Sequence, residues 1–196
     1  MKEIRIDDIQ ISNDKPFVLI AGLNVLEEEK VILEVISKCK QDAEKFKIPY
    51  IFKASYDKAN RSSFSSYRGP GVKKGLAILS ELKRDFNVPV ISDIHTPEEA
   101  ELAAEVLDII QIPAFLSRQT DLIEAACMTS RPLNIKKAQF LAPSDMINIL
   151  NKCSHFKNEQ VIICERGTSF GYNNLVVDML GICLLYTSPS PRDTNE

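Results

Sequence analysis

The sequence lacks several features that would place it in common classes of protein. No apolar run reaches the roughly 18 residues of a membrane span, and no signal peptide precedes the first predicted strand. The five cysteines follow no metal-binding spacing, and most are expected to be small core residues in a reducing cytoplasm. A glycine-rich phosphate loop of the Rossmann or P-loop kind is also missing. These absences predict a cytoplasmic protein and argue against an open α/β phosphate-binding module that is complete at this length.

The charge of the chain is mildly negative overall but positive at particular places. A net charge of −3 argues against nucleic acid as the main partner, and 44% hydrophobic residues are ordinary for a globular protein. Cationic side chains nevertheless lie at or just past the ends of predicted strands, at Lys53, Lys58, Arg61, Arg118, Lys136 and Arg166. A local excess of cations on an acidic protein predicts an anionic metabolite as ligand.

Short apolar runs alternate with helical patterns along the chain. The predicted strands are Phe17–Ala21, Pro49–Phe52, Val88–Ser92, Ile109–Ile112, Pro132–Ile135 and Gln160–Cys164. The predicted helices are Glu27–Lys47, Val72–Phe86, Pro97–Val106, Asp121–Thr129 and Ala142–Cys153. This alternation predicts a parallel α/β sheet, either doubly wound or closed as a (β/α)8 barrel of the TIM type.

Polar residues follow all six predicted strands, which favours the barrel, because all carboxyl ends of barrel strands meet on one face. A barrel of this type usually needs about 250 residues, whereas this chain has 196. We therefore expect an incomplete TIM barrel of about six βα units over residues 1–182, with a β-hairpin in Lys2–Ile11 closing one end. Residues 183–196 contain Ser-Pro-Ser-Pro and lack periodicity, so we expect a disordered, non-native-looking tail there.

The segment 52–63 has the composition of a site for a small, multiply charged anion. Lys53 ends an apolar run, and Lys58, Asn60, Arg61 and several hydroxyl groups follow within eight residues. Lysine supplies a point charge and arginine a planar fork, while hydroxyl and backbone N–H groups fill the remaining directions. The alternative is a solvated polar loop after a strand.

Other candidate residues remain undecided from the residues alone. Lys136 and Lys137 are adjacent, so one points into the barrel and its neighbour toward the helices, and the pattern does not say which. Asp93 and His95 share a strand face, where the histidine is either functional or structural. Glu165 is either a site residue or the ion-pair partner of Arg166.

Several motifs together resemble a known enzyme family. They are DKANRSS at 57–63, YRGPG at 67–71, QIPAFL at 111–116, RQTD at 118–121, NIKK at 134–137, ERGT at 165–168 and FGYNNL at 170–175. In order and spacing they resemble the 3-deoxy-D-manno-octulosonate 8-phosphate synthases (2-dehydro-3-deoxyphosphooctonate aldolases), from about Phe17 to Gly181. The related 3-deoxy-7-phosphoheptulonate synthases usually have KPRTS where this chain has KANRS at 58–62.

The resemblance implies a reaction and roles for individual residues. The family condenses phosphoenolpyruvate with D-arabinose 5-phosphate and water to form the eight-carbon phosphosugar acid of lipopolysaccharide and inorganic phosphate. By resemblance, Lys136, Arg166 and the backbone of Ala114 would hold the phosphoenolpyruvate phosphate. Lys53 and Lys58, with Ser55 nearby, would face its carboxylate. Asn60, Arg61 and Ser62 would bind the pentose phosphate.

The remaining implied roles are catalytic or concern assembly. Asn24, Lys58, Asp93 and His95 are the catalytic candidates, with Asp93 bonding sugar hydroxyls, and Gln111 and Pro113 are further substrate-binding candidates. Phe115 and Arg118 would reach into the site of a neighbouring subunit, because the family typically forms homotetramers. Lys137→Ala is expected to be nearly silent as a control for Lys136→Ala.

The expectation on metal rests on one residue. Metal-dependent members of the family carry a cysteine ligand in the loop after the first barrel strand, where this chain has Asn24, and the other ligands would lie beyond Gly181. Asparagine is a poor substitute for a thiolate, so we predict a metal-independent enzyme without a cofactor. Two alternatives remain: an inactive fragment that binds phosphate weakly, and the related seven-carbon synthase.

Overall fold

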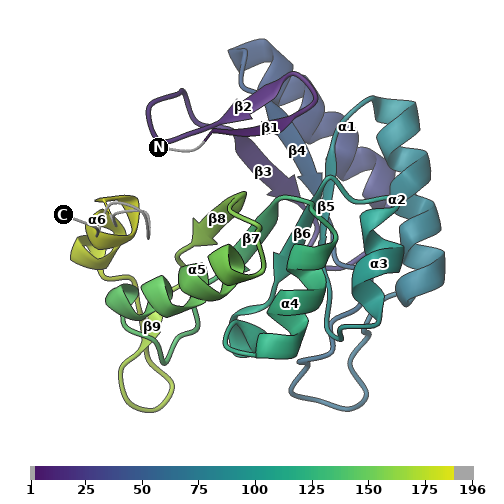
Figure 1. The fold of residues 1–196 in the computed structure, drawn as a ribbon. Helices are drawn as coiled ribbons and strands as arrows, with labels where there is room; N and C mark the ends of the chain where they lie inside the picture. The colour runs from purple at the N-terminus through teal and green to yellow at the C-terminus, as the bar shows by residue number, and fades with distance from the viewer. Residues whose placement is uncertain (1–2, 188–196) are drawn as a thin grey trace.

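The computed structural model describes residues 3–187 and has a curled, six-stranded parallel sheet at its centre (Figure 1). Its strands are β3 (Leu19–Gly22), β4 (Tyr50–Lys53), β5 (Val90–Asp93), β6 (Ile109–Ile112), β7 (Leu133–Lys136) and β8 (Val161–Cys164). Each strand pairs with the next one along the chain, in the order β3-β4-β5-β6-β7-β8. This is the order of an incomplete TIM barrel, so the predicted fold class is confirmed.

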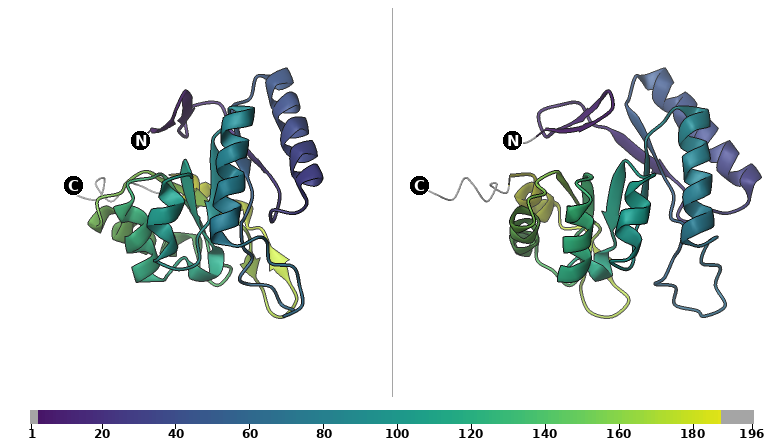
Figure 2. Two further views of the ribbon diagram at one scale, coloured as in Figure 1. Left: turned by 90° about the vertical axis from the view of Figure 1, so that its right-hand side faces the viewer. Right: turned by 45° about the vertical axis from the view of Figure 1, so that its right-hand side comes forward.

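Helices cover one face of the sheet, as expected when a crossover connects each pair of parallel strands (Figure 2). They are α1 (Glu29–Phe46), α2 (Val72–Phe86), α3 (Glu99–Ala104), α4 (Thr120–Met128) and α5 (Met146–His155), with short 3-10 turns at Ala114–Leu116 and Pro143–Asp145. The predicted order of strands and helices is confirmed. The shortest helix, α3, begins at Glu99 rather than at Pro97, and it ends two residues before Val106.

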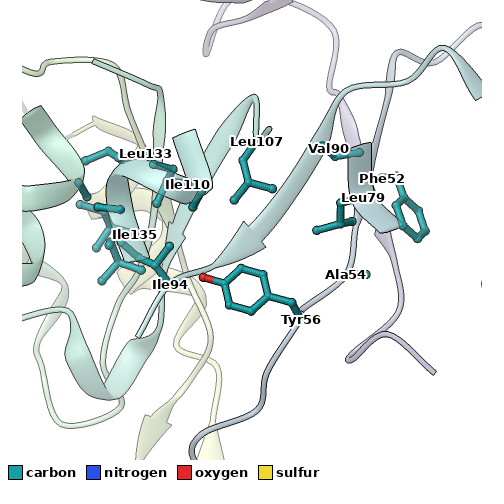
Figure 3. Packing of buried hydrophobic residues seen from close by; sticks show 14 of the residues in the cluster. Phe52, Ala54, Tyr56, Leu79, Val90, Ile94, Leu107, Ile110, Leu133 and Ile135 are labelled. Atoms are coloured by element: carbon teal, nitrogen blue, oxygen red, sulfur yellow. The ribbon is translucent and has the colours of Figure 1, made fainter. Parts of the chain in front are cut away.

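The alternation of side chains along the strands creates two hydrophobic clusters. The larger one fills the space between sheet and helices and includes Phe52, Val90, Ile110, Leu133 and Ile135 (Figure 3). The smaller one lies on the opposite, inner face and includes Ile51, Ile91 and Ile109, together with Ile4 and Ile6. Successive residues of a strand therefore separate cleanly into an outer and an inner set.

The hairpin predicted in Lys2–Ile11 is confirmed for the part that the structure describes. Strand β1 (Ile4–Ile6) pairs antiparallel with β2 (Ile9–Ile11), and Asp7 adopts a left-handed conformation in the turn. The isoleucines of the hairpin pack on the inner cluster, so it covers the end at which the sheet strands begin (Figure 1). The site must then lie at the other end, where the strands finish.

The segment after β8 differs from the expectation. A small antiparallel pair, β9 (Thr168–Ser169) with β10 (Leu175–Val176), is followed by α6 (Met179–Thr187). The prediction of a structureless stretch from Cys183 is therefore wrong for residues 183–187, while residues 188–196 lie outside the described part. Within residues 3–187, no helix is both long enough and apolar enough to span a membrane.

Candidate functional site

A buried carboxylate forms the centre of the site. Asp93 ends β5 on the inner face, two residues after Ile91, and only 3% of it is exposed. The Ser55 hydroxyl donates to Oδ1, and the Lys58 Nζ donates to Oδ2 over 3.2 Å. Burial alone would raise the pKa of Asp93, but His95, Lys53 and Lys58 outweigh it and hold that pKa well below its usual range.

His95 lies beside this carboxylate, where it is held by a second acid. Its Nε2 is 3.5 Å from Asp93 Oδ2, and its Nδ1 is 3.6 Å from Glu99 Oε2. The same Glu99 oxygen accepts the backbone N–H of His95 (2.9 Å) and the hydroxyl of buried Tyr56 (2.7 Å). Burial lowers the pKa of His95, but the two carboxylates overcome that effect and raise it to about 9. The imidazole is therefore cationic at neutral pH.

Lys53 completes the group of charges around Asp93. Its Nζ donates to Ser55 Oγ at 2.8 Å and to the backbone carbonyl oxygen of Asn24 at 3.3 Å. Burial is the main reason why its pKa falls to about 7, with Asp93 opposing and with Lys58 and Lys136 adding to the fall. The repulsion from Lys136 also indicates that these two ammonium groups face the same space.

This perturbed lysine predicts a pH-dependent affinity for anions. Lys53 is protonated below about pH 7 and loses its charge as the pH rises through that value, while His95 keeps its charge up to about pH 9. A bound anion favours the charged form, so binding of a phosphate-bearing anion should take up a proton and weaken above pH 7. The measurement is calorimetry in two buffers of different ionisation enthalpy, above the phosphate's own second pKa of about 6. Lys53→Met should abolish the proton uptake, and a wild type that takes up no proton would contradict the prediction.

The strands β6 and β7 add an amide pair to the same end of the sheet. Gln111, opposite Asp93 in the register, accepts a hydrogen bond of 3.2 Å from Asn134 Nδ2. Lys136 follows Asn134 by two residues and therefore points to the same inner face. Arg166 lies just past β8, and its Nη1 is buried without a hydrogen-bond partner among the described residues. The inward lysine is thus Lys136, which the sequence alone left open.

The burial and contacts of Lys137 differ from two predictions made from the sequence, one on Lys137 and one on Glu165. Its side chain is fully buried on the outer face, where its Nζ lies within 3.3 Å of four oxygen atoms. Lys137→Ala is therefore not a silent control. Glu165 was expected as a possible ion-pair partner of Arg166, but its Oε2 lies 3.7 Å from Lys137 Nζ. Its Oε1 accepts the backbone N–H groups of Arg166 and Gly167.

Other predicted residues lie further out. Asn60, Arg61 and Ser62 are exposed in the loop between β4 and α2, which projects from the end of the sheet at which the strands finish (Figure 1). Arg61 Nε donates to the carbonyl oxygen of Tyr67 over 3.2 Å. In the turn after β6, Pro113 is half-buried and Ala114 is buried, whereas Phe115 and Arg118 are exposed. The structure thus brings Lys53, Ser55, Lys58 and His95 together around Asp93 and leaves Asn60, Arg61 and Ser62 outside this group.

Sequence reasoning missed Glu99 and Tyr56 as partners of the site. Glu99 lies four residues after His95, at the start of α3, and this spacing was the only available signal for the pair. Tyr56 lies in the segment predicted to bind anions, but its ring is buried in the outer cluster (Figure 3). Its hydroxyl donates to Glu99, and its ring meets the edge of the His95 ring with the centroids 6.2 Å apart.

Asn24, the residue on which the metal expectation rests, lies exposed in the loop after β3, and its carbonyl oxygen contacts Lys53. Across residues 3–187, the His, Cys, Asp and Glu side chains form no cluster of three or more that could hold a metal ion. An asparagine amide also does not fit the thiolate position of a soft-metal site. Independence from metal remains a proposal.

Comparison with known proteins identifies the family. The profile of the DAHP synthetase I family matches residues 2–190. Proteins named 2-dehydro-3-deoxyphosphooctonate aldolase are similar to this chain, including one from Pseudomonas putida (strain GB-1), 60% identical over 184 residues. Another, from Hahella chejuensis, is 59% identical over 184 residues. Each alignment covers 94% of this chain and 66% of the relative, so the chain spans slightly less than two thirds of their length. The match over nearly the whole chain shows that it belongs to the DAHP synthetase I family.

Proposed function

We propose that the protein condenses phosphoenolpyruvate with D-arabinose 5-phosphate and water, giving 3-deoxy-D-manno-octulosonate 8-phosphate and inorganic phosphate in lipopolysaccharide biosynthesis. The observation that carries the proposal is a group of cations at the strand ends. Lys53 and Lys58 lie beside the carboxylate of Asp93, while Lys136 interacts with Lys53 and lies with Arg166 near Cys164 at the end of β8. The substrates bring two phosphates and a carboxylate into one cavity, and buried anions require such fixed cations. The names of the relatives support the same reaction.

The reaction follows from this arrangement of charges. Lys136 and Arg166 hold the phosphate of phosphoenolpyruvate, while Lys53 and Lys58 hold its carboxylate. Carbon 3 of the enol attacks the aldehyde carbon of the pentose, whose hydroxyl groups bond to Asp93. Water adds at carbon 2, and cleavage of the C–O bond releases phosphate. The site contributes near-attack geometry and electrostatic stabilisation of both anions.

The test of this proposal uses the complete reading frame that encodes this chain. Purified protein is given phosphoenolpyruvate with either arabinose 5-phosphate or erythrose 4-phosphate, and phosphate release and the product's chain length are measured. We expect turnover with the pentose phosphate only. Use of the tetrose phosphate alone would assign the protein to the seven-carbon synthases, against which the KANRS segment at 58–62 argues.

The same proposal includes assembly and location. We infer a homotetramer in the cytoplasm, supported by the exposure of Phe115 (51%) and Arg118 just outside the site. In the described part, β3 and β8 are the two outer strands of the sheet, and further strands beside them would close the barrel. Sedimentation of the complete protein measures the assembly. Activity of the 196-residue chain alone decides whether it is a working enzyme or a fragment that binds phosphate weakly.

Independence from a divalent metal is a further prediction, and Asn24 motivates it. The complete protein should keep its full rate after exhaustive chelation, because the position that would need a thiolate holds an amide. The measurement is the initial rate with and without chelator. Loss of activity on chelation, with recovery on adding zinc, manganese or iron, would show that the reading of Asn24 is wrong.

The matched variant is Asn24→Cys, which places a thiol at the same position. Together with ligands from outside this chain, this thiol is expected to form a divalent-metal site with sulfur, nitrogen and oxygen ligands. Metal content by elemental analysis should rise in the variant relative to wild type. Its turnover should be no higher than that of wild type, because the surrounding groups are not arranged to orient metal ligands.

A further inference from the structure

The ammonium group of Lys137 is fully buried and joins two loops. The side chain is 0% exposed, on the outer face of the sheet next to β7. Its Nζ lies near the carbonyl oxygens of Ala138 (3.3 Å), Leu141 (3.2 Å) and Gly167 (3.3 Å), the Thr168 hydroxyl (3.2 Å) and Glu165 Oε2 (3.7 Å). A buried charge is tolerated only with such partners, so this lysine is fixed rather than mobile.

The two loops are the ones that follow the strands carrying the phosphate-binding candidates. Ala138 and Leu141 belong to the loop after β7, which ends with Lys136, and Gly167 belongs to the loop after β8, which carries Arg166. Two backbone hydrogen bonds also connect these segments, from Lys137 N to Cys164 O (2.9 Å) and from Ser169 N to Gln139 O (3.0 Å). The ammonium thus fixes one loop relative to the other.

Glu165 extends this connection to Arg166. One of its carboxylate oxygens faces Lys137, and the other accepts the backbone N–H groups of Arg166 (3.0 Å) and Gly167 (2.5 Å). Gly167 has a φ of +88°, and a Cβ there would come within 2.9 Å of Leu175, so this turn requires glycine. The backbone of Arg166 is therefore set by a carboxylate that the Lys137 ammonium holds, while its own Nη1 lacks a partner among residues 3–187.

We propose that Lys137 is a positioning residue for the phosphate subsite, which acts through Glu165 and Gly167 to place the guanidinium of Arg166 opposite Lys136. The inference rests on the proposed function for the identity of the ligand, phosphoenolpyruvate. Lys137 does not touch the substrate, since it points to the outer face with Leu133 and Ile135. A side chain that only stabilised the fold would affect both substrates equally.

The decisive measurement is calorimetric affinity for phosphoenolpyruvate, which does not depend on turnover. In the complete protein, Lys137→Met removes the charge and keeps much of the volume. We expect its affinity for phosphoenolpyruvate to fall by about 10-fold or more, since small misplacements of a binding group have large effects. The KM for arabinose 5-phosphate should change by less than about 2-fold. Lys137→Arg, which keeps the charge, should recover part of the loss.

Two further variants separate positioning from loss of stability. Leu79→Ala removes a fully buried side chain of α2, remote from both loops, and should lower Tm without a selective effect on phosphoenolpyruvate. Glu165→Gln is the milder substitution if Lys137→Met does not fold, and it should weaken phosphoenolpyruvate binding by about 3-fold or more. Unchanged affinity, or an equal loss for both substrates as in Leu79→Ala, overturns the inference. A wild type that binds phosphoenolpyruvate but does not turn it over refutes the proposed reaction and leaves the positioning role standing.

Discussion

Lys136→Ala should weaken the use of phosphoenolpyruvate by about 2–4 kcal/mol, because it removes a charge-assisted contact to a buried anion. This corresponds to a loss of about 30- to 1000-fold in kcat/KM for phosphoenolpyruvate. Lys136 shares the inner face with Asn134, and its charge lowers the pKa of Lys53 across the site. Removing it should therefore also raise the pKa of Lys53, which reduces the proton uptake on binding near pH 7.

Arg61→Ala is the complementary variant and should act mainly on arabinose 5-phosphate. Arg61 is exposed in the loop after β4, and its terminal nitrogens form no hydrogen bond within the described chain, which leaves them open to an anion. Its loss should raise the KM for the pentose phosphate and leave phosphoenolpyruvate affinity nearly unchanged. Steady-state kinetics with each substrate varied in turn distinguish the two variants.

The control for both variants must not be Lys137, which is buried. Lys45→Ala removes one exposed positive charge near the far end of α1, and its effect on either substrate should be small. Equal and small effects of Lys136→Ala and Arg61→Ala on both substrates would contradict the division into two anion subsites.

The strands, the helices and their order were predictable because local pattern determines them. Each sheet strand lies within two residues of its predicted bounds, since buried parallel strands form short apolar runs between polar turns. The pattern did not reveal which face of each strand points inward. That choice depends on contacts between distant segments, here the packing of Ile51, Ile91 and Ile109 against the isoleucines of the hairpin.

The missed features share a physical cause. Lys137 and Glu165 are 28 residues apart, and their connection depends on how two loops approach each other, which no local pattern contains. The helix α6 has the sequence MLGICLLYT, almost without polar residues, so it shows no amphipathic period and was not recognised. The site residues found in advance were those at strand ends, where topology alone brings them together.

Asp93→Asn should be the most damaging single substitution at this site. The change keeps the shape of the side chain but leaves three neighbouring cations, Lys53, Lys58 and His95, without their shared counter-charge. Removing one partner of a buried ion pair typically costs about 3–5 kcal/mol of stability. We therefore expect a clear fall in Tm, a fall in the pKa of His95, and loss of activity with both substrates.

Three groups with shifted pKa values determine the pH dependence of this loss: Asp93, His95, and Lys53, whose charge is lost as pH rises through about 7. The pKa of Asp93 is lowered, so its stabilising effect is present above its ordinary value of 3.8 and is lost as pH falls through the folded value. The pKa of His95 is raised, so its contribution is complete below 6.5 and is lost as pH rises through about 9. The difference in unfolding free energy between wild type and Asp93→Asn should be greatest between these limits and should narrow toward pH 9.

Chemical denaturation of both proteins at a series of pH values measures this difference directly. Asp121→Asn is the matched control, because this aspartate is exposed in the first turn of α4 and contributes only a modest interaction with the helix dipole. Its effect should be small and nearly constant over the same pH range. If Asp93→Asn behaved like Asp121→Asn, the carboxylate would not be balancing the surrounding cations, and the electrostatic basis of the site would have to be abandoned.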